Sequence, residues 1–182
     1  MYWEKPGPQN TVNTINLAIK RGKELGIRHV VVASCTGDTA LKLANQGFDL
    51  TCVTHHVGFS GPGQDEMPAE TRQELTGLGV KVLTSTHLLA GVDRAVRNHF
   101  GGVYPAEIIA QTLRMFGQGV KVAIEIATMA KDAGMIPHDT EVVSIAGSAS
   151  GADSAIVVVP AHSNHFWETQ VREIICMPRV KK

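Results

Sequence analysis

The chain has 182 residues, of which 43% are hydrophobic and 19% are charged. That length and apolar content are enough for one compact domain with a sizeable core, so we expect a single domain over residues 1–182. The 17 basic side chains balance the 17 acidic ones. Without a net positive charge, binding to nucleic acid or to an anionic membrane is not expected.

The sequence shows neither a targeting segment nor a membrane span. Residues 1–6 lack the basic and apolar regions of a signal peptide, and no apolar run approaches the ~20 residues that cross a bilayer. We therefore expect a cytoplasmic protein. Its cysteines, Cys35, Cys52 and Cys176, are widely spaced and form no CxxC pair, which argues against a disulfide framework or a zinc site. Cys52 and Cys176 are expected in the core.

The first half of the chain alternates between helix and strand. Apolar residues at helical spacing after Asn10 predict a helix that stops near Gly26. Beyond it, apolar runs predict strands at 28–33, 49–54 and 80–84, with helices at 37–46 and 68–78 between them. Strands that alternate with helices in this way predict a parallel sheet.

The second half begins with helices and ends with strands. Helical patterns cover residues 92–98, 106–116 and 120–133, and apolar runs at 141–146 and 155–159 predict the fourth and fifth strands. The link between these two strands has no room for a crossover helix, so the fifth strand is predicted to be antiparallel. A last apolar run at 174–176 suggests a short edge strand.

Two loops rich in small and hydroxyl residues each follow a predicted strand. Residues 34–39 read Ser-Cys-Thr-Gly-Asp-Thr, and residues 147–153 read Gly-Ser-Ala-Ser-Gly-Ala-Asp. The first loop precedes a helix, so it offers backbone N–H groups, hydroxyls and the positive end of a helix dipole, which suit an anionic ligand group. The alternative is a plain helix cap by Thr36 or Thr39.

Parallel sheets bind ligands beyond the carboxyl ends of their strands, and the unusual polar residues of this chain fall there. We therefore predict one small-molecule site, with the two loops as two of its walls. The predicted contact residues are Ser34, Cys35, Thr36, Gly37, Asp38, Thr39, Thr54, His55, Gly147, Ser148, Ser150, Gly151, Ala152 and Asp153. The Gly- and Pro-rich stretch 57–65 is either a lid over these strand ends or an inert surface loop.

Cys35 is a candidate nucleophile, because a thiol near a helix N-terminus can have a lowered pKa and His55 could act as its base. A cysteine phosphatase, however, needs a phosphate-binding Arg six residues further on, where this chain has Leu41. The alternative is a spectator thiol that lines the pocket. His55 and His87 are candidate proton donors for any reaction there.

The histidines suggest a metal site, but their spacing argues against one. His55 and His56 are neighbours in an extended segment, so they point to opposite faces, and no carboxylate stands at a ligand spacing. No metal is therefore predicted. His162 and His165 are expected in a surface turn.

Each of the two loops also contains an aspartate. Asp38 and Asp153 could accept hydrogen bonds from a ribityl, ribose or ring N–H group, or they could brace their own loops through backbone N–H groups. Both interpretations stay open. No Walker A, GxGxxG or GxSxG pattern occurs, which argues against NTPase, standard dinucleotide-binding and serine-hydrolase functions.

The first loop resembles the phosphate-binding loop of the pyruvate kinase C-terminal domain. In that family a strand runs into Thr-x-Ser-Gly-Arg-Ser, which holds a phosphate of an allosteric sugar bisphosphate. The matching positions by place and chemistry are Ser34, Thr36, Gly37 and Thr39, whereas Asp38 replaces the family's Arg.

Nearly the whole chain is similar to small, stand-alone archaeal and bacterial relatives of that domain. The matching segments are Glu4–Gly7, Val53–His56, Phe100–Ile109, Thr112–Gly119 and Gly151–Asp153. The resemblance implies a three-layer α/β/α fold, a five-stranded sheet in the order 3-2-1-4-5 with strand five antiparallel, and FMN as the bound cofactor. Ser148 and Ser150 stand where these relatives usually carry Thr and Arg.

Three functions are compatible with these patterns. The first is binding of a phosphate-bearing small molecule, FMN above all, at the carboxyl ends of strands one and four, with flavin-dependent redox chemistry as a candidate reaction. The second is a metabolite-sensing module without chemistry, like the allosteric domain of pyruvate kinase. The third is a Cys35-dependent hydrolase or phosphoryl-transfer enzyme. Pyruvate kinase activity is not expected, because the catalytic barrel is missing. The apolar content is compatible with a homo-oligomer.

Overall fold

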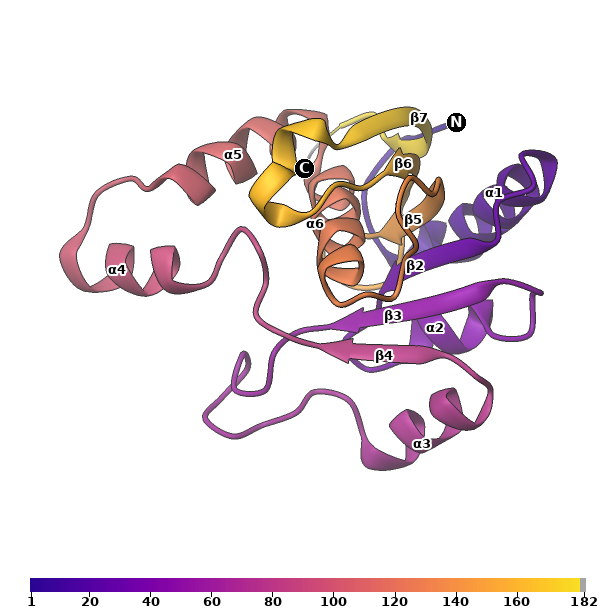
Figure 1. Cartoon of the computed structure of the whole chain (residues 1–182), viewed down its shortest axis with the longest axis horizontal. Coiled ribbons are helices and arrows are strands. Elements are labelled where there is room, and N and C mark those ends of the chain that lie inside the picture. The colour runs from indigo at the N-terminus through magenta and orange to yellow at the C-terminus, as the bar shows by residue number, and fades with distance from the viewer. Residues whose placement is uncertain (181–182) are drawn as a thin grey trace.

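A seven-stranded sheet forms the centre of the molecule (Figure 1), and the computed structural model describes residues 1–180. β2 (His29–Ala33), β3 (Asp49–Thr54), β4 (Lys81–Thr84) and β5 (Val142–Ala146) are parallel to one another. β6 (Ser154–Val159) is antiparallel to β5 and to β7 (Gln170–Pro178). With β1 (Tyr2–Trp3) at one edge, the strand order is β1-β7-β6-β5-β2-β3-β4.

The sheet differs in detail from the predicted five-stranded one. The five predicted strands are β2, β3, β4, β5 and β6, and they lie side by side in the implied order. The antiparallel fifth strand is confirmed. The predicted edge strand at 174–176 is the longer β7, and it is not at the edge, because β1 pairs with it through Tyr2 and Trp3. A strand of two residues is too short to show an apolar period.

Helices cover both faces of this sheet, so the predicted three layers are confirmed (Figure 1). α1 (Thr11–Glu24), α2 (Asp38–Leu43) and α3 (Ala69–Gly77) pack on one face. α6 (Gln118–Asp132) packs on the other. The prediction for α2 extended three residues too far, since the chain leaves the helix after Leu43 and Asn45 takes a left-handed φ of 63°.

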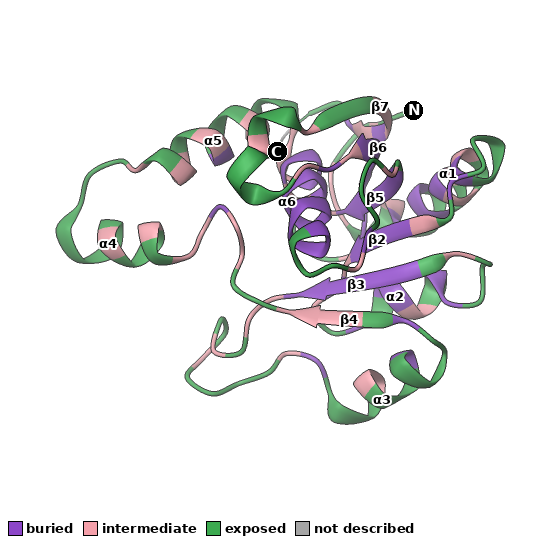
Figure 2. Cartoon of the chain, in the orientation of Figure 1, coloured by how far each residue is buried: buried purple, intermediate pink, exposed green. Residues whose placement is uncertain are grey.

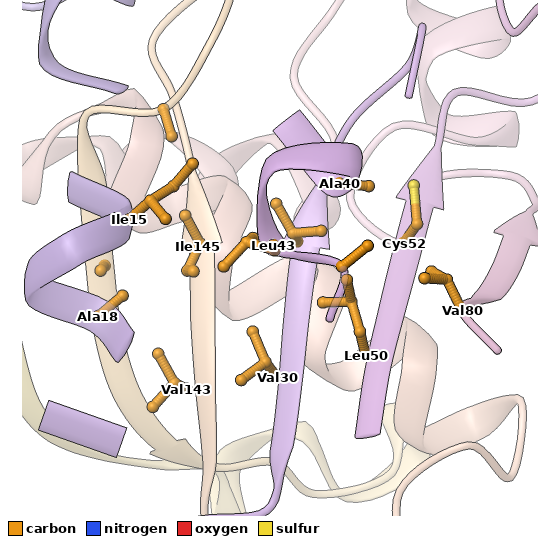
Figure 3. Packing of buried hydrophobic residues seen from close by; sticks show 14 of the residues in the cluster. Ile15, Ala18, Val30, Ala40, Leu43, Leu50, Cys52, Val80, Val143 and Ile145 are labelled. Carbon is orange, nitrogen blue, oxygen red and sulfur yellow. The ribbon is translucent and has the colours of Figure 1, made fainter. Parts of the chain in front are cut away.

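The alternation of side chains along each strand divides the core into two clusters. Val30 of β2 and Val143 of β5 pack with Ile15 of α1 and Leu43 of α2 (Figure 3). Val31, the neighbour of Val30, packs on the opposite face with α6. Cys52 and Cys176 are fully buried in the first cluster, as expected for small core residues.

α6 is the most deeply buried helix of the three-layer arrangement (Figure 2). Of its 15 residues, 12 are buried, including the apolar Ile126, Met129 and Ala130. The buried set also includes the charged Lys121, Glu125 and Lys131, which a helical pattern of apolar residues does not predict. Three charged side chains of α6 are therefore buried.

α4 (Val92–Phe100) and α5 (Pro105–Leu113) project sideways from the sheet (Figure 1). None of the nine residues of α4 is buried, and Phe100 is 76% exposed. Short 3₁₀ turns cover 8–10, 114–116 and 163–168. The last contains His165 and follows His162, both exposed, which confirms the surface turn. Within residues 1–180, no helix combines the length and apolar character that a bilayer crossing requires.

The buried carboxylate of Asp153 ties the N-terminal segment to the loop between β5 and β6. Its Oδ2 accepts the N–H groups of Gly7 (3.0 Å) and Ser148 (3.1 Å), and its Oδ1 accepts the hydroxyl of Ser154 (2.9 Å). The indole N–H of Trp3 donates to the backbone oxygen of Asp153 at 2.8 Å. The interpretation that Asp153 braces its own loop is therefore the one that the structure shows.

Asp153→Ala is predicted to destabilise the fold by roughly 3 kcal/mol, because it leaves several donors without a partner. Asp153→Asn keeps one acceptor oxygen and should lose less. Urea unfolding of the two variants and the parent chain measures the difference. An alanine variant within about 0.5 kcal/mol of the parent would show that water replaces the carboxylate and that the brace does not matter.

Candidate functional site

One cavity of about 710 Å³ opens at the carboxyl ends of β2, β3 and β5. That volume lies within the range of cofactor pockets, about 300–1,000 Å³. Residues of both loops, 34–39 and 147–153, line it. The predicted juxtaposition of the two loops is confirmed, and it follows from the parallel pairing of β2 with β5. The chain runs from β5 through the loop 147–153 directly into β6, so no helix separates this loop from the loop after β2.

The loop after β2 is held by a serine cap and a glycine. Ser34 Oγ accepts the N–H groups of Thr39 (3.1 Å) and Ala40 (3.4 Å) in the first turn of α2. The expected alternative, a cap by Thr36 or Thr39, is therefore wrong, because the hydroxyl that binds the first turn belongs to Ser34. Gly37 has a φ of +95°, and a Cβ there would lie 2.4 Å from Thr71 Cγ2. Only glycine fits this turn.

The loop after β5 is equally constrained. A Cβ on Gly147 would lie 2.3 Å from the backbone oxygen of Gly151, and one on Gly151 would lie 2.3 Å from Thr11 Oγ1. Thr11 Oγ1 also accepts the N–H of Ala152 at 3.0 Å. The loop is thus packed against the start of α1, with Ser150 exposed beside the cavity.

Most of the predicted site residues reach the cavity. Its lining includes Ser34, Cys35, Thr36, Asp38, Thr39, Thr54, His55, His87, Gly147, Ser148, Ser150 and Gly151. Gly37, Ala152 and Asp153 do not belong to the lining. Gly37 shapes the first loop, whereas Ala152 and Asp153 are buried and fix the second.

The sequence missed the charged side chains that the helices bring to this cavity. Lys42 of α2, Arg94 of α4, and Arg114 line it, and Lys121 and Glu125 of α6 form a buried ion pair in its wall. Glu125 Oε1 also accepts the N–H of Leu89 at 2.7 Å. Burial lowers the pKa of Lys121, which the attraction of Glu125 opposes. The i, i+4 spacing of an acid and a base was the available signal.

Apart from the Lys121–Glu125 pair, the charges around the cavity are mostly positive. The lining contains three cations, Lys42, Arg94 and Arg114, and two acidic side chains, Asp38 and Glu66. Lys42 Nζ donates to the backbone oxygen of Asp38 at 3.2 Å, and Arg114 Nε donates to Gln118 Oε1 at 2.6 Å. Three cations beside hydroxyl-bearing loops favour an anionic group over a cationic one.

A thiol, an imidazole and a carboxylate meet in the wall of this cavity. The potential ligand atoms of Cys35, His55 and Glu66 lie within 4.8 Å of one another, and His55 Nδ1 is 2.6 Å from Glu66 Oε2. The ring of Phe59 stacks on His55 with centroids 3.7 Å apart. The stretch 57–65 thus carries a residue into the site, as the lid alternative requires, and Phe59 and Glu66 were missed by sequence reasoning.

The protonation of the candidate catalytic groups limits the chemistry. Burial raises the pKa of the Cys35 thiol, against a smaller opposite effect of the backbone at His55. This burial opposes the lowered thiol pKa that the position near a helix N-terminus led us to expect. Burial also lowers the pKa of His87, so its imidazole is neutral near pH 7.

A comparison with protein families identifies this arrangement. A family model described as "Pyruvate kinase, alpha/beta domain" matches residues 13–158, well over half of the chain. The chain belongs to this family. The pyruvate kinase alpha/beta domain match spans both loops and every strand from β2 to β5. It ends before β7 and begins after β1, so the two additional strands of the sheet lie outside it.

Lys121→Met is predicted to destabilise the fold by about 3–5 kcal/mol, because it leaves the carboxylate of Glu125 buried without its cation. The double variant Lys121→Met/Glu125→Gln should recover part of this loss, since Gln still accepts the N–H of Leu89. Lys131→Met is a matched control, because Lys131 is similarly buried on the same helix but donates to the carbonyl of Pro137.

We expect the control to lose about 1 kcal/mol, the value of a single hydrogen bond. Urea unfolding of all three variants provides the measurement. Equal losses for Lys121→Met and Lys131→Met would contradict the importance of the ion pair.

Proposed function

We propose that this protein binds a phosphate-bearing small molecule in the cavity between the two loops, and that this ligand is FMN. The observation that carries the proposal is the combination of hydroxyls and cations around one cavity. Thr36 and Thr39 offer hydroxyl donors from the first loop, and Lys42 of α2 adds a positive charge beside them. Hydroxyls and a cation that line the same cavity are suited to a phosphate.

The remainder of the cavity suits a flat ring system. Its volume of about 710 Å³ leaves room beyond a phosphate group. Thr54, His55 and the second loop would surround the ring. When bound, FMN supplies hydride or single-electron transfer, while the protein supplies binding and orientation. A neutral His87 in the same wall could donate a hydrogen bond to the ligand or its partner.

Regulatory binding without chemistry is the second candidate. The match to the pyruvate kinase alpha/beta domain is compatible with it. The raised pKa of the Cys35 thiol is in line with this candidate, and it counts against a hydrolase or a phosphoryl-transfer enzyme that uses Cys35 as nucleophile. Reduction of bound FMN by NAD(P)H would favour the redox function over the regulatory one.

Titrations with FMN and with riboflavin test the phosphate contact directly. FMN should bind the parent chain more tightly than riboflavin, which has the same ring and ribityl chain but no phosphate. Thr36→Val should weaken FMN binding by about tenfold, the loss of one hydrogen bond to a charged group, and leave riboflavin binding unchanged. Thr76→Val is the matched control, because Thr76 is an exposed residue of α3 outside the cavity.

Equal affinities for FMN and riboflavin would overturn the phosphate contact. No binding of FMN, together with binding of a sugar phosphate, would overturn the flavin assignment and keep the phosphate site.

A further inference from the structure

We propose that Cys35, His55 and Glu66 form a binding site for Zn²⁺, with a fourth coordination position open to the cavity. The three residues come from different segments of the chain. Cys35 lies in the loop after β2, His55 directly follows β3, and Glu66 ends the irregular stretch before α3. In the described part of the chain, residues 1–180, theirs is the one group of three such side chains whose ligand atoms all approach within 4.8 Å.

The kinds of donor select the metal. A thiolate sulfur, an imidazole nitrogen and a carboxylate oxygen are the three ligand types that zinc combines in proteins. Mg²⁺ and Ca²⁺ favour oxygen ligands and would leave the thiol unused. Three protein ligands with one open position are typical of zinc sites that bind a water or a substrate, whereas structural sites use four.

Neighbouring contacts order the segments that carry His55 and Glu66. The backbone oxygen of His55 accepts the hydroxyl of Thr54 at 2.8 Å, and Phe59 stacks on the His55 ring. Next to Glu66, Asp65 accepts the N–H of Met67 at 3.0 Å and an N–H of Arg72 at 2.7 Å. Ligands that are oriented before the metal arrives lose less conformational freedom on binding.

The site keeps its charge and proton balance when zinc enters. The Cys35 thiol releases its proton to solvent, and the proton between His55 Nδ1 and Glu66 Oε2, which are 2.6 Å apart, leaves that contact for His55 Nε2 or for solvent, so His55 binds as a neutral imidazole and Glu66 as a carboxylate. Two ligand charges then offset the metal charge. All three side chains line the cavity, so the open position faces the space between the loops, where a water or an oxygen of a bound ligand can complete the tetrahedron.

The zinc proposal differs from the expectation that no metal binds. That expectation rested on the lack of a carboxylate at a ligand spacing from the histidines. Glu66 lies 11 residues after His55 in the sequence, and the stretch between them folds back so that the two side chains touch. The zinc proposal does not rest on FMN binding, because the three ligand atoms come from the protein alone, but His55 belongs to both proposed sites.

Titration of the purified full-length chain with Zn²⁺, after treatment with a chelator, tests the proposal. A chromophoric chelator reports the affinity, and Co²⁺ in place of Zn²⁺ reports sulfur ligation through its thiolate-to-cobalt absorption. We expect one equivalent of metal per chain and the thiolate absorption. Cys35→Ser and Glu66→Gln should each weaken zinc binding by at least about tenfold, and Cys35→Ser should abolish the thiolate absorption.

Two controls address other sites. His56→Gln changes the histidine next to His55, whose Nδ1 contacts the backbone oxygen of Val57, and Cys176→Ala removes a fully buried thiol. Both should keep one equivalent of bound zinc. Zinc should also raise the thermal midpoint of the parent chain and not that of Cys35→Ser, which reports on the site even if a variant is less stable.

Several results would overturn the proposal: zinc binding unchanged in Cys35→Ser and Glu66→Gln, absence of the thiolate absorption, or loss of binding in His56→Gln alone. The test is separate from that of the proposed function. Thr36→Val should bind zinc like the parent chain, and the metal-free protein should still distinguish FMN from riboflavin.

Discussion

The parallel pairing of β2 with β5 determines where the chemistry of this protein can take place. Val30 pairs with Val143 and Val32 with Ile145, so the two strands end at the same edge of the sheet. The loops at 34–39 and 147–153 then have to meet, since each continues from one of these ends. Without this pairing the hydroxyl groups, the glycines and the cations would not surround one cavity.

The cavity depends in turn on polar groups buried around it. Asp153 ties the second loop to the N-terminal segment, and Ser34 caps the helix that follows the first. On the other side, Glu125 joins α6 to the backbone of Leu89. These groups are hydrogen-bonded within the protein, whereas Thr36 and Ser150 are exposed at the cavity. Rigid loops with exposed donors are what a small anionic ligand requires.

Local patterns in the sequence predicted most of the fold. The strands β2 to β6 could be located because runs rich in β-branched residues end at Gly, Ser, Thr or Pro, and the short link at 147–153 determined the direction of β6. What could not be predicted depends on contacts between distant residues. β1 pairs with β7 across nearly the whole chain, and the contact of Glu66 with His55 depends on how an irregular stretch folds back. Lys121 and Glu125 lie within a helical pattern of apolar residues, and that pattern alone does not predict a buried ion pair.

The central claim is that the cavity binds a phosphate-bearing ligand, and the small molecule that leaves the protein on denaturation tests it most directly. Its absorption spectrum and mass should be those of FMN or of another phosphate ester. A released molecule without a phosphate group would contradict the account. So would a protein that releases nothing and whose thermal midpoint does not change with saturating FMN.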